Sequence, residues 1–136
     1  MCHTYHVTPI RISFQPGQPI VDQVVFAAIR VFVSGQMGPG DAFPSVRVLA
    51  ADLKIHPNTA LKVIQHLVRE GWLEVHPGIG TVVAKRPRPR DDERRRLLDE
   101  ELDRLVVEAK SKGVSLEELQ EAIAQRWRAI GDKEGE

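Results

Sequence analysis

The chain has 136 residues, of which 42% are hydrophobic and 28% are charged, and its formal net charge is zero. These values are ordinary for a globular protein, and the length allows one compact domain or a small domain with an appendage. The sequence has no apolar run long enough for a membrane span, no signal-peptide core and a single cysteine, so we expect a cytoplasmic protein without an internal disulfide.

The net charge of zero conceals an uneven distribution along the chain. Residues 1–90 contain ten Lys or Arg and five Asp or Glu, a net of +5, whereas residues 91–136 contain nine and fourteen, a net of −5. A division of this kind indicates two parts with different roles. The basic part is the candidate for binding an anionic partner, and the acidic part is expected to stay away from one.

The first predicted elements are a short strand and a long helix. "RISF" at 11–14 reads as the strand, and the turn "QPGQ" follows it. The segment "PIVDQVVFAAIRVFVSGQM" is expected to be helical until about Gly35, before the breaker cluster "GPGDAFP". Its apolar residues recur at helical spacing: Ile20, Val24, Ala27, Ala28 and Val31.

Two further helices are separated by only three residues. The second runs through "VRVLAADL" after Ser45, a favourable N-cap, and the connection "KIH" follows it. The third spans 58–70, with Pro57 suited to its first position and Gly71 to its left-handed exit. Two helices joined by so short a turn form a helix-turn-helix, whose second helix enters the major groove of DNA. The inward-facing residues of the shorter helix are Val46, Leu49 and Leu53.

The third helix separates apolar from polar side chains almost completely. Its apolar side comprises Ala60, Leu61, Val63, Ile64, Leu67 and Val68. Its polar side comprises Asn58, Thr59, Lys62, Gln65, His66, Arg69 and Glu70. Most of these polar side chains are donors of the kind that read base edges and hold phosphates. Taken alone, the helix has a simple alternative, an ordinary solvated face.

A β-hairpin is predicted after the third helix. The runs "WLEVH" and "TVVAK" flank the turn "PGIG". Three helices followed by a hairpin form a winged helix, so the fold class is mainly α with a small β-hairpin (α+β), and the DNA-binding domain spans 10–84. Gly78 and Gly80 at the tip would let the backbone approach a phosphate or a groove closely. The alternative is a plain structural hairpin. The base of the wing carries His76, Lys85 and Arg86.

The rest of the chain divides into a basic, Pro-rich linker at 85–90 and a tail at 91–131. The linker "KRPRPR" either follows a phosphate backbone or is simply solvated. In the tail, two amphipathic helices each carry an apolar stripe, and a capping box joins Ser115 and Glu118. So short a pair cannot bury both stripes, and we expect a second copy of the chain to cover them. The stripe residues are Leu98, Leu102, Leu105, Val106, Ala109, Leu116, Leu119, Ile123, Trp127 and Ile130.

Several short motifs resemble those of the GntR family of bacterial transcription regulators. They are "PGD-x-x-PS-x-R-x-LA", the "PNT" helix start, the "REGW" exit and the "G-x-GT" wing, and together they cover residues 10–84. The short two-helix tail is similar to that of the YtrA subfamily. The resemblance implies a dimeric regulator, most simply a repressor of its own operon, that binds operator DNA, with transporter genes as candidate targets.

The resemblance also implies individual DNA contacts. They are Ser45 and Arg47 on the second helix, Asn58, Thr59 and Lys62 on the third, and His76, Gly78, Gly80 and Thr81 around the wing. Gln65 joins them from the polar side of the third helix. The chain departs from the family pattern at three positions: Lys54 replaces a usual glycine in the turn, His56 replaces a small polar N-cap, and Ile64 replaces a common tyrosine. At His56 we expect a weakened N-cap.

Other functions are less well supported by the residues. A winged helix can serve as a protein-interaction module, but Arg47, Lys62 and Arg69 keep the basic face that such modules tend to lose. Cys2, His3 and His6 are the weak candidates for a metal site, and we expect no metal and no cofactor. No nucleophile–base pair or phosphate loop is present, so we expect no enzyme. A small-molecule effector would bind at the dimer interface or between the tail and the DNA-binding domain.

Overall fold

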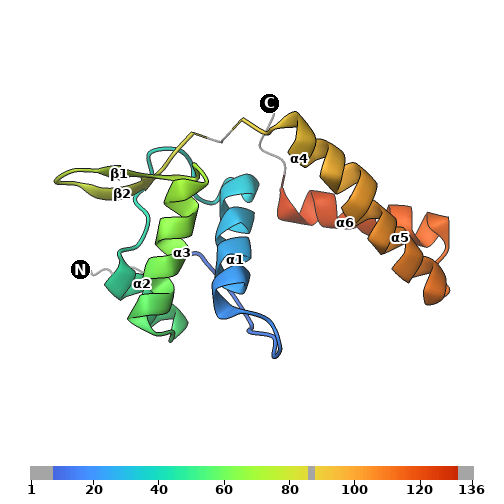
Figure 1. The fold of residues 1–136 in the computed structure, drawn as a ribbon, viewed down its shortest axis with the longest axis horizontal. Helices are drawn as coiled ribbons and strands as arrows, with labels where there is room; N and C mark the ends of the chain where they lie inside the picture. Colours follow the sequence, from blue (N-terminus) through green and yellow to red (C-terminus); the bar gives the residue numbers. More distant parts are fainter. Residues whose placement is uncertain (1–7, 86–87, 132–136) are drawn as a thin grey trace. The chain divides into compact units, whose positions relative to one another are not determined.

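The computed structural model describes residues 8–85 and 88–131, which fold into two compact units (Figure 1). The unit within residues 8–85 contains three helices and a two-stranded antiparallel sheet, and we call it the winged domain. The unit within residues 88–131 is helical, and we call it the tail. No helix of the described residues is long and apolar enough to cross a membrane.

Helix α1 (Ile20–Ser34) is the long helix predicted from the sequence. Pro19 precedes it with extended backbone, Asp22 lies in its first turn, and Gly35 ends it in the left-handed region with φ 88°. The predicted apolar face is buried at Val24, Ala27, Ala28 and Val31. Ile20 is the exception, because it lies in the first turn and remains 37% exposed.

Helices α2 (Val46–Leu53) and α3 (Pro57–Arg69) form the predicted helix-turn-helix. The turn closes at Lys54, the one described residue other than glycine with a positive φ (57°, with ψ 48°). There the N–H groups of Lys54 and Ile55 both donate to the carbonyl of Ala50. The family's usual glycine would adopt this left-handed conformation without steric strain, whereas the Cβ of lysine makes the conformation less favourable.

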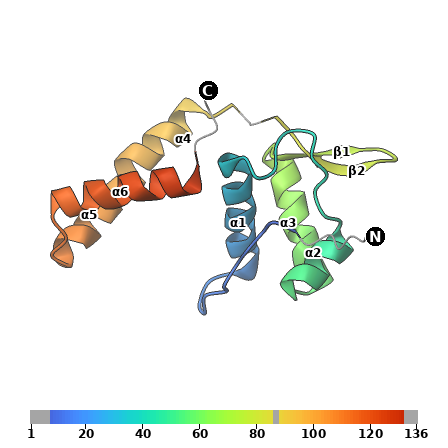
Figure 2. The same cartoon turned by 180° about the vertical axis from the view of Figure 1, so that it is seen from behind.

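The core of the winged domain lies where α1, α2 and the hairpin meet α3. Helices α1 and α3 lie side by side, and α2 packs against α3 (Figure 1; Figure 2). Phe32 of α1 stacks on Trp72 with 5.8 Å between ring centroids and meets Phe43 at 5.9 Å. Ile64, at the position where the family often has tyrosine, is buried. The most deeply buried large side chains are Leu49, Leu67, Leu73, Val24 and Val63.

Strands β1 (Leu73–His76) and β2 (Gly80–Val83) form the predicted hairpin, with Leu73 opposite Val83 and His76 opposite Gly80. Strand β2 begins one residue earlier and ends two residues earlier than predicted. A short third stretch joins it: Ala42 bridges Val82, the N–H of Phe43 donates to the Thr81 carbonyl at 2.9 Å, and the N–H of Val83 donates to the Asp41 carbonyl at 2.8 Å. The hairpin is therefore anchored along β2 to the loop before α2.

The strand predicted at 11–14 is wrong, because these residues have no regular secondary structure and pair with no strand. The alternation that suggested a strand is real: Ile10 is buried, and Ile12 and Phe14 pack against the core while Arg11 and Ser13 are exposed. Packing against the helices satisfies that alternation without a partner strand. A hydrogen bond from the Thr8 N–H to Oδ2 of Asp52 at 3.0 Å ties the segment to α2.

The tail contains one interrupted helix and one regular helix. Helix α4 (Asp91–Arg96) continues through a π-helical turn, η1 (Leu97–Glu101), into α5 (Leu102–Ser111). After the bend at Gly113, α6 (Leu116–Ile130) begins with the predicted capping box: Ser115 Oγ accepts from the Glu118 N–H at 3.0 Å, and Glu118 Oε1 accepts from the Ser115 N–H at 2.9 Å. Periodicity predicted two uninterrupted helices, so the π turn is a departure in the first.

Candidate nucleic-acid interface

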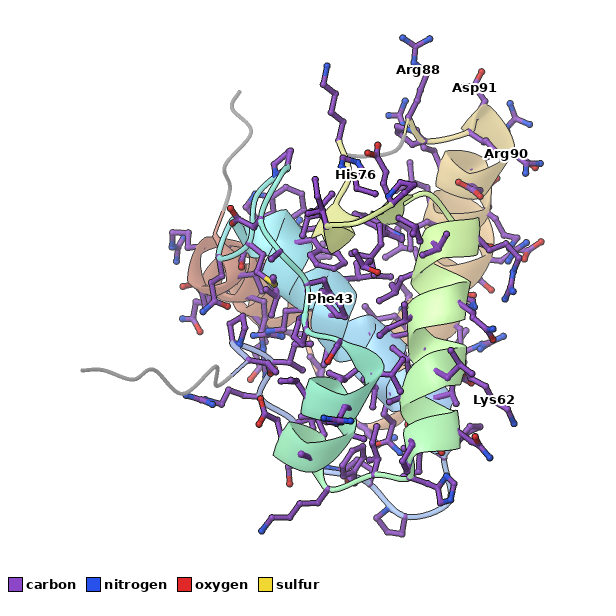
Figure 3. All side chains as sticks on the ribbon, turned by 90° about the vertical axis from the view of Figure 1, so that its left-hand side faces the viewer. Phe43, Lys62, His76, Arg88, Arg90 and Asp91 are labelled. Carbon is purple, nitrogen blue, oxygen red and sulfur yellow. The ribbon has the colours of Figure 1, made fainter. Side chains whose placement is uncertain are left out.

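The outward side of α3 carries a single polar stripe. Asn58, Lys62, Gln65 and Arg69 are exposed, and spacings of four, three and four residues align them along the helix. Figure 3 shows Lys62 projecting outward from α3. Thr59 is half-buried and lies at the edge of the stripe. Three of the four aligned residues were predicted as DNA contacts, and Arg69 extends their row to the end of the helix.

Leu61 adjoins this stripe, contrary to its predicted place on the buried side of α3. It is 41% exposed. It lies three residues after Asn58 and four before Gln65, so on a helix it is the neighbour of both. Periodicity put it with the apolar residues because it lies at the boundary between the two sides. The stripe thus includes one apolar side chain of the type that can contact a thymine methyl group.

Helix α2 presents its first turn to solvent. Ser45 caps the helix, and its Oγ accepts from the Val48 N–H at 3.2 Å. Because Oγ accepts this bond, the hydroxyl proton remains available for an external acceptor. Arg47 follows, and its side chain is exposed. A hydroxyl and a guanidinium in one helical turn form a suitable pair of donors for phosphate oxygens.

Two cations of this surface are not neutralised within the protein. Neither Arg47 nor Lys62 takes part in an ion pair or side-chain hydrogen bond with another described residue. Arg69 differs, because its Nη2 lies 3.3 Å from Nδ1 of His66, one turn earlier on α3. Arg47 and Lys62 therefore retain all of their donors for an external anion.

The hairpin extends from the end of α3 on the side opposite α1 (Figures 1 and 2). Gly78 and Gly80 have φ values of 80° and 122°, which an L side chain adopts only with strain. The predicted place of His76 at the base of the wing is wrong, because His76 ends β1 beside the turn, opposite Gly80. Its Nε2 lies 2.9 Å from Oε1 of Glu74. Thr81 is half-buried. All four wing residues predicted as DNA contacts are thus at least partly accessible, and His76 already has an acidic neighbour.

Helix α3 has a side-chain N-cap at His56, where a weakened N-cap was expected. His56 takes the N-cap position with extended backbone, and its Nδ1 accepts from the Asn58 N–H at 3.0 Å. An imidazole nitrogen accepts the capping hydrogen bond that a serine or asparagine oxygen would accept at this position. The sequence offered a signal for this, because histidine is the one ring side chain that carries an acceptor so close to its own backbone.

In the tail, the residues predicted for dimerisation are mostly exposed. Only Ala109 is buried, and Val106, Leu119 and Ile130 are half-buried. The exposed members are Leu98, Leu102, Leu105, Leu116, Ile123 and Trp127. Leu97, which was not predicted, is also 61% exposed. The tail thus presents an extended apolar surface with several exposed large side chains.

No group of three or more His, Cys, Asp or Glu that could hold a metal ion occurs among residues 8–85 and 88–131. The candidate ligands Cys2, His3 and His6 lie outside the described residues. The features that the described residues do bring together are cations, amides and hydroxyls on a helix-turn-helix with an adjoining wing.

Comparison with known proteins identifies the family. The model for "Bacterial regulatory proteins, gntR family" matches residues 22–83. The chain is 34% identical over 117 residues to the HTH-type transcriptional repressor YtrA of Bacillus subtilis (strain 168), covering 85% of this chain and 90% of that protein.

Two solved structures extend the comparison. A transcriptional antiterminator from Listeria monocytogenes EGD-e superposes with a TM-score of 0.78 at 22% identity, covering 96% of this chain and 99% of that one, which shows the fold alone. YtrA from Sulfolobus acidocaldarius, a GntR-family transcription factor, gives a TM-score of 0.58 at 28% identity, covering 74% and 99%. With the helix-turn-helix, the wing and the curated relative in agreement, the chain belongs to the gntR family of bacterial regulatory proteins, which are transcription regulators and not enzymes.

Proposed function

We propose that the protein is a repressor that binds a double-stranded DNA operator as a homodimer. The observation that carries the proposal is the pair of cations without internal partners, Arg47 on α2 and Lys62 on α3, on the two helices of a helix-turn-helix. The Bacillus relative is named a repressor, which supports repression as the direction of control. Occupying DNA near a promoter would block polymerase without any catalysis.

Helix α3 would read the operator from the major groove, which is wide enough to admit a helix. Asn58 and Gln65 carry amide groups that suit adenine edges, and Lys62 suits guanine or phosphate. Leu61 would add an apolar contact. Because these residues form one stripe, a single orientation of α3 would bring all of them to the base pairs.

Helix α2 and the wing would fix that orientation through the DNA backbone. The Ser45 hydroxyl and the Arg47 guanidinium would donate to phosphate oxygens, which position a protein without reading sequence. The glycines at the wing tip would allow the chain to approach the backbone or the minor groove, and His76 and Thr81 would lie beside it. The basic, Pro-rich linker could add further phosphate contacts.

Dimerisation would occur through the tail. The exposed leucines of η1 and α5 and the stripe of α6 present more apolar surface than single scattered residues would, and such patches mark interaction sites. A two-fold axis would place the same patch of each copy against its counterpart. Two reading helices would then face half-sites about one helical turn apart, or a multiple of it.

The regulated genes are a further part of the proposal. The resemblance to the YtrA subfamily supports control of the protein's own operon and of transporter genes. An effector, if the protein has one, would bind at the dimer interface or between the tail and the winged domain. Selection of genomic DNA fragments on the purified full-length protein would identify the operator, and its position relative to the protein's own gene would test autoregulation.

The direct test is operator affinity. Fluorescence anisotropy on a selected duplex would compare the wild-type protein with Arg47→Ala and Lys62→Ala, using Lys110→Ala in the acidic tail as the matched control. We expect the first two to lose about 1–3 kcal/mol of binding free energy each if they contact the DNA directly, and the control to lose none. Unchanged affinity with both residues replaced would remove α2 and α3 as the DNA-binding surface. Failure of the wild type to select any DNA would favour a protein-interaction module.

A further inference from the structure

We propose that His56 is an additional DNA-binding residue, which caps α3 through Nδ1 and donates a hydrogen bond from Nε2 to an operator phosphate. The inference rests on the proposed function, because it requires α3 to enter the major groove. His56 is outside the set of contacts that the family pattern implies.

The cap determines the orientation and the tautomer of the ring. Nδ1 lies 3.0 Å from the Asn58 backbone nitrogen and accepts its N–H. A nitrogen that accepts cannot carry the proton of a neutral imidazole, so that proton is on Nε2. Nε2 lies across the ring from the capping bond and therefore points away from the helix start. The protein has fixed a donor in place before any ligand arrives, which lowers the entropic cost of using it.

The donor is also accessible and unused. His56 is exposed, and the one hydrogen bond of its side chain with another described residue is the capping bond to Asn58. Lys54, two residues earlier in the same turn, is exposed and takes part in no ion pair with another described residue. The turn before α3 therefore presents an ammonium group and an imidazole N–H without a carboxylate paired to either, a combination that suits an anion.

The position of His56 makes a phosphate the expected anion. When a reading helix enters the major groove, its N-terminal residues approach the base edges. His56 precedes the first helical residue, Pro57, so it would lie farther out than Asn58, toward the phosphates that border the groove. Capping gives a role to Nδ1 alone, and serine or asparagine would cap equally well. A phosphate contact would give a role to Nε2.

The test separates the two nitrogens. His56→Ser retains a capping oxygen close to the backbone but lacks the distant donor, whereas His56→Ala lacks both. We expect His56→Ser to unfold at the wild-type temperature to within about 1 °C and to bind the operator about 5- to 20-fold more weakly, as loss of a hydrogen bond to a charged group would produce. His56→Ala should lose both stability and affinity. His56→Asn provides a second capping variant should the serine variant unfold early.

Operators carrying a single methylphosphonate would then identify the phosphate. At one position in the operator, the methylphosphonate should lower the affinity of the wild-type protein. The same substitution should not lower the affinity of His56→Ser further, because that variant has already lost the contact. Wild-type affinity in a stable His56→Ser protein would overturn the inference while leaving the proposed function intact. Weakened binding with no coupled phosphate would also overturn it. Absence of operator binding by the wild type would instead overturn the proposed function.

Discussion

Glu74 and His76 lie two residues apart on β1, and their side chains meet with 2.9 Å between Oε1 and Nε2. Residues two apart on a strand point to the same side, so the pairing follows from the strand itself. Both side chains are about half exposed, at 54% and 45% respectively. The wing therefore carries a carboxylate directly beside a residue predicted to contact DNA.

Replacing that carboxylate should strengthen DNA binding. In Glu74→Gln, the amide keeps a similar size but removes a negative charge near the DNA backbone. We expect affinity to rise about two- to fivefold at low salt, which corresponds to about 0.5–1 kcal/mol, a typical value for an exposed charge interaction. Anisotropy titrations at low and high salt would measure it, and the gain should shrink as salt screens the charge. Weaker binding by Glu74→Gln would mean that the carboxylate orients His76 productively.

Lys54 provides a stability prediction from the turn between α2 and α3. The left-handed backbone destabilises a residue with a Cβ by about 1–2 kcal/mol. Glycine would remove this cost, but part of the gain would be offset because glycine gives the unfolded chain more conformational freedom. Lys54→Gly should therefore stabilise the winged domain by about 1 kcal/mol and raise its unfolding temperature by about 5 °C. Circular dichroism during heating would measure the change.

The matched control for this change is Lys62→Gly, which makes the same chemical substitution within α3. Because Lys62 has helical backbone, glycine there should destabilise the domain by about 1 kcal/mol. Opposite signs for the two variants would attribute the effect to backbone conformation. A lower unfolding temperature for Lys54→Gly would show that the lysine side chain stabilises the turn by more than its strain costs.

The helix-turn-helix could be predicted closely because its signals are local. Ser45 at an N-cap, Pro57 at a first helical position and Gly71 after α3 each mark a boundary through backbone chemistry that neighbouring residues do not change. The buried side of α3 followed from periodicity except at its edge, where Leu61 belongs to the polar side. The same local reasoning placed the hairpin but only approximated the ends of β2.

The features that escaped prediction depend on contacts distant in sequence or on a small irregularity. Ala42 pairs with Val82, forty residues later, and nothing near Ala42 indicates a strand. The alternation around Ile12 predicted a strand but could not show that helices would cover it. The π turn inserts one extra residue into a helix whose apolar spacing already fitted an uninterrupted α-helix. The DNA contacts themselves remain predictions, because the structure gives their accessibility and not their partner.

Salt dependence should separate phosphate contacts from base contacts. Each phosphate neutralised by a cation contributes about −0.9 to the slope of log affinity against log salt concentration. Lys62→Ala should make the slope shallower by about one if the ammonium binds a phosphate, whereas Gln65→Ala should leave the slope unchanged and relax sequence preference. Titrations at several salt concentrations, on the operator and on a single-base variant, would measure both. A flat slope for the wild-type protein would argue for a protein partner.

The π turn makes a specific prediction about the dimer. In η1 the N–H of Leu102 donates to the carbonyl of Leu97, five residues earlier, so these two residues lie one π turn apart on the same side. In an uninterrupted α-helix, a separation of five residues would rotate them about 140° apart. The turn therefore adds Leu97 to the surface formed by Leu102 and Leu105. Val107, two residues after Leu105, points to the other side of α5.

We therefore expect Leu97→Gln and Leu105→Gln to weaken the dimer and Val107→Gln to leave it intact. Val107 is the matched control because it is also apolar and, at 60% exposed, is as accessible as Leu97 at 61%. Sedimentation velocity over a range of concentrations would give the dimer dissociation constant of each full-length variant. Operator affinity should fall in the same two variants. In a dimer the two copies are tethered, so binding to the second half-site is intramolecular, and a monomer loses this advantage. Equal dissociation constants for Leu97→Gln and Val107→Gln would exclude η1 from the dimer surface, and a wild-type monomer that binds a palindromic operator tightly would exclude the tail as the source of affinity.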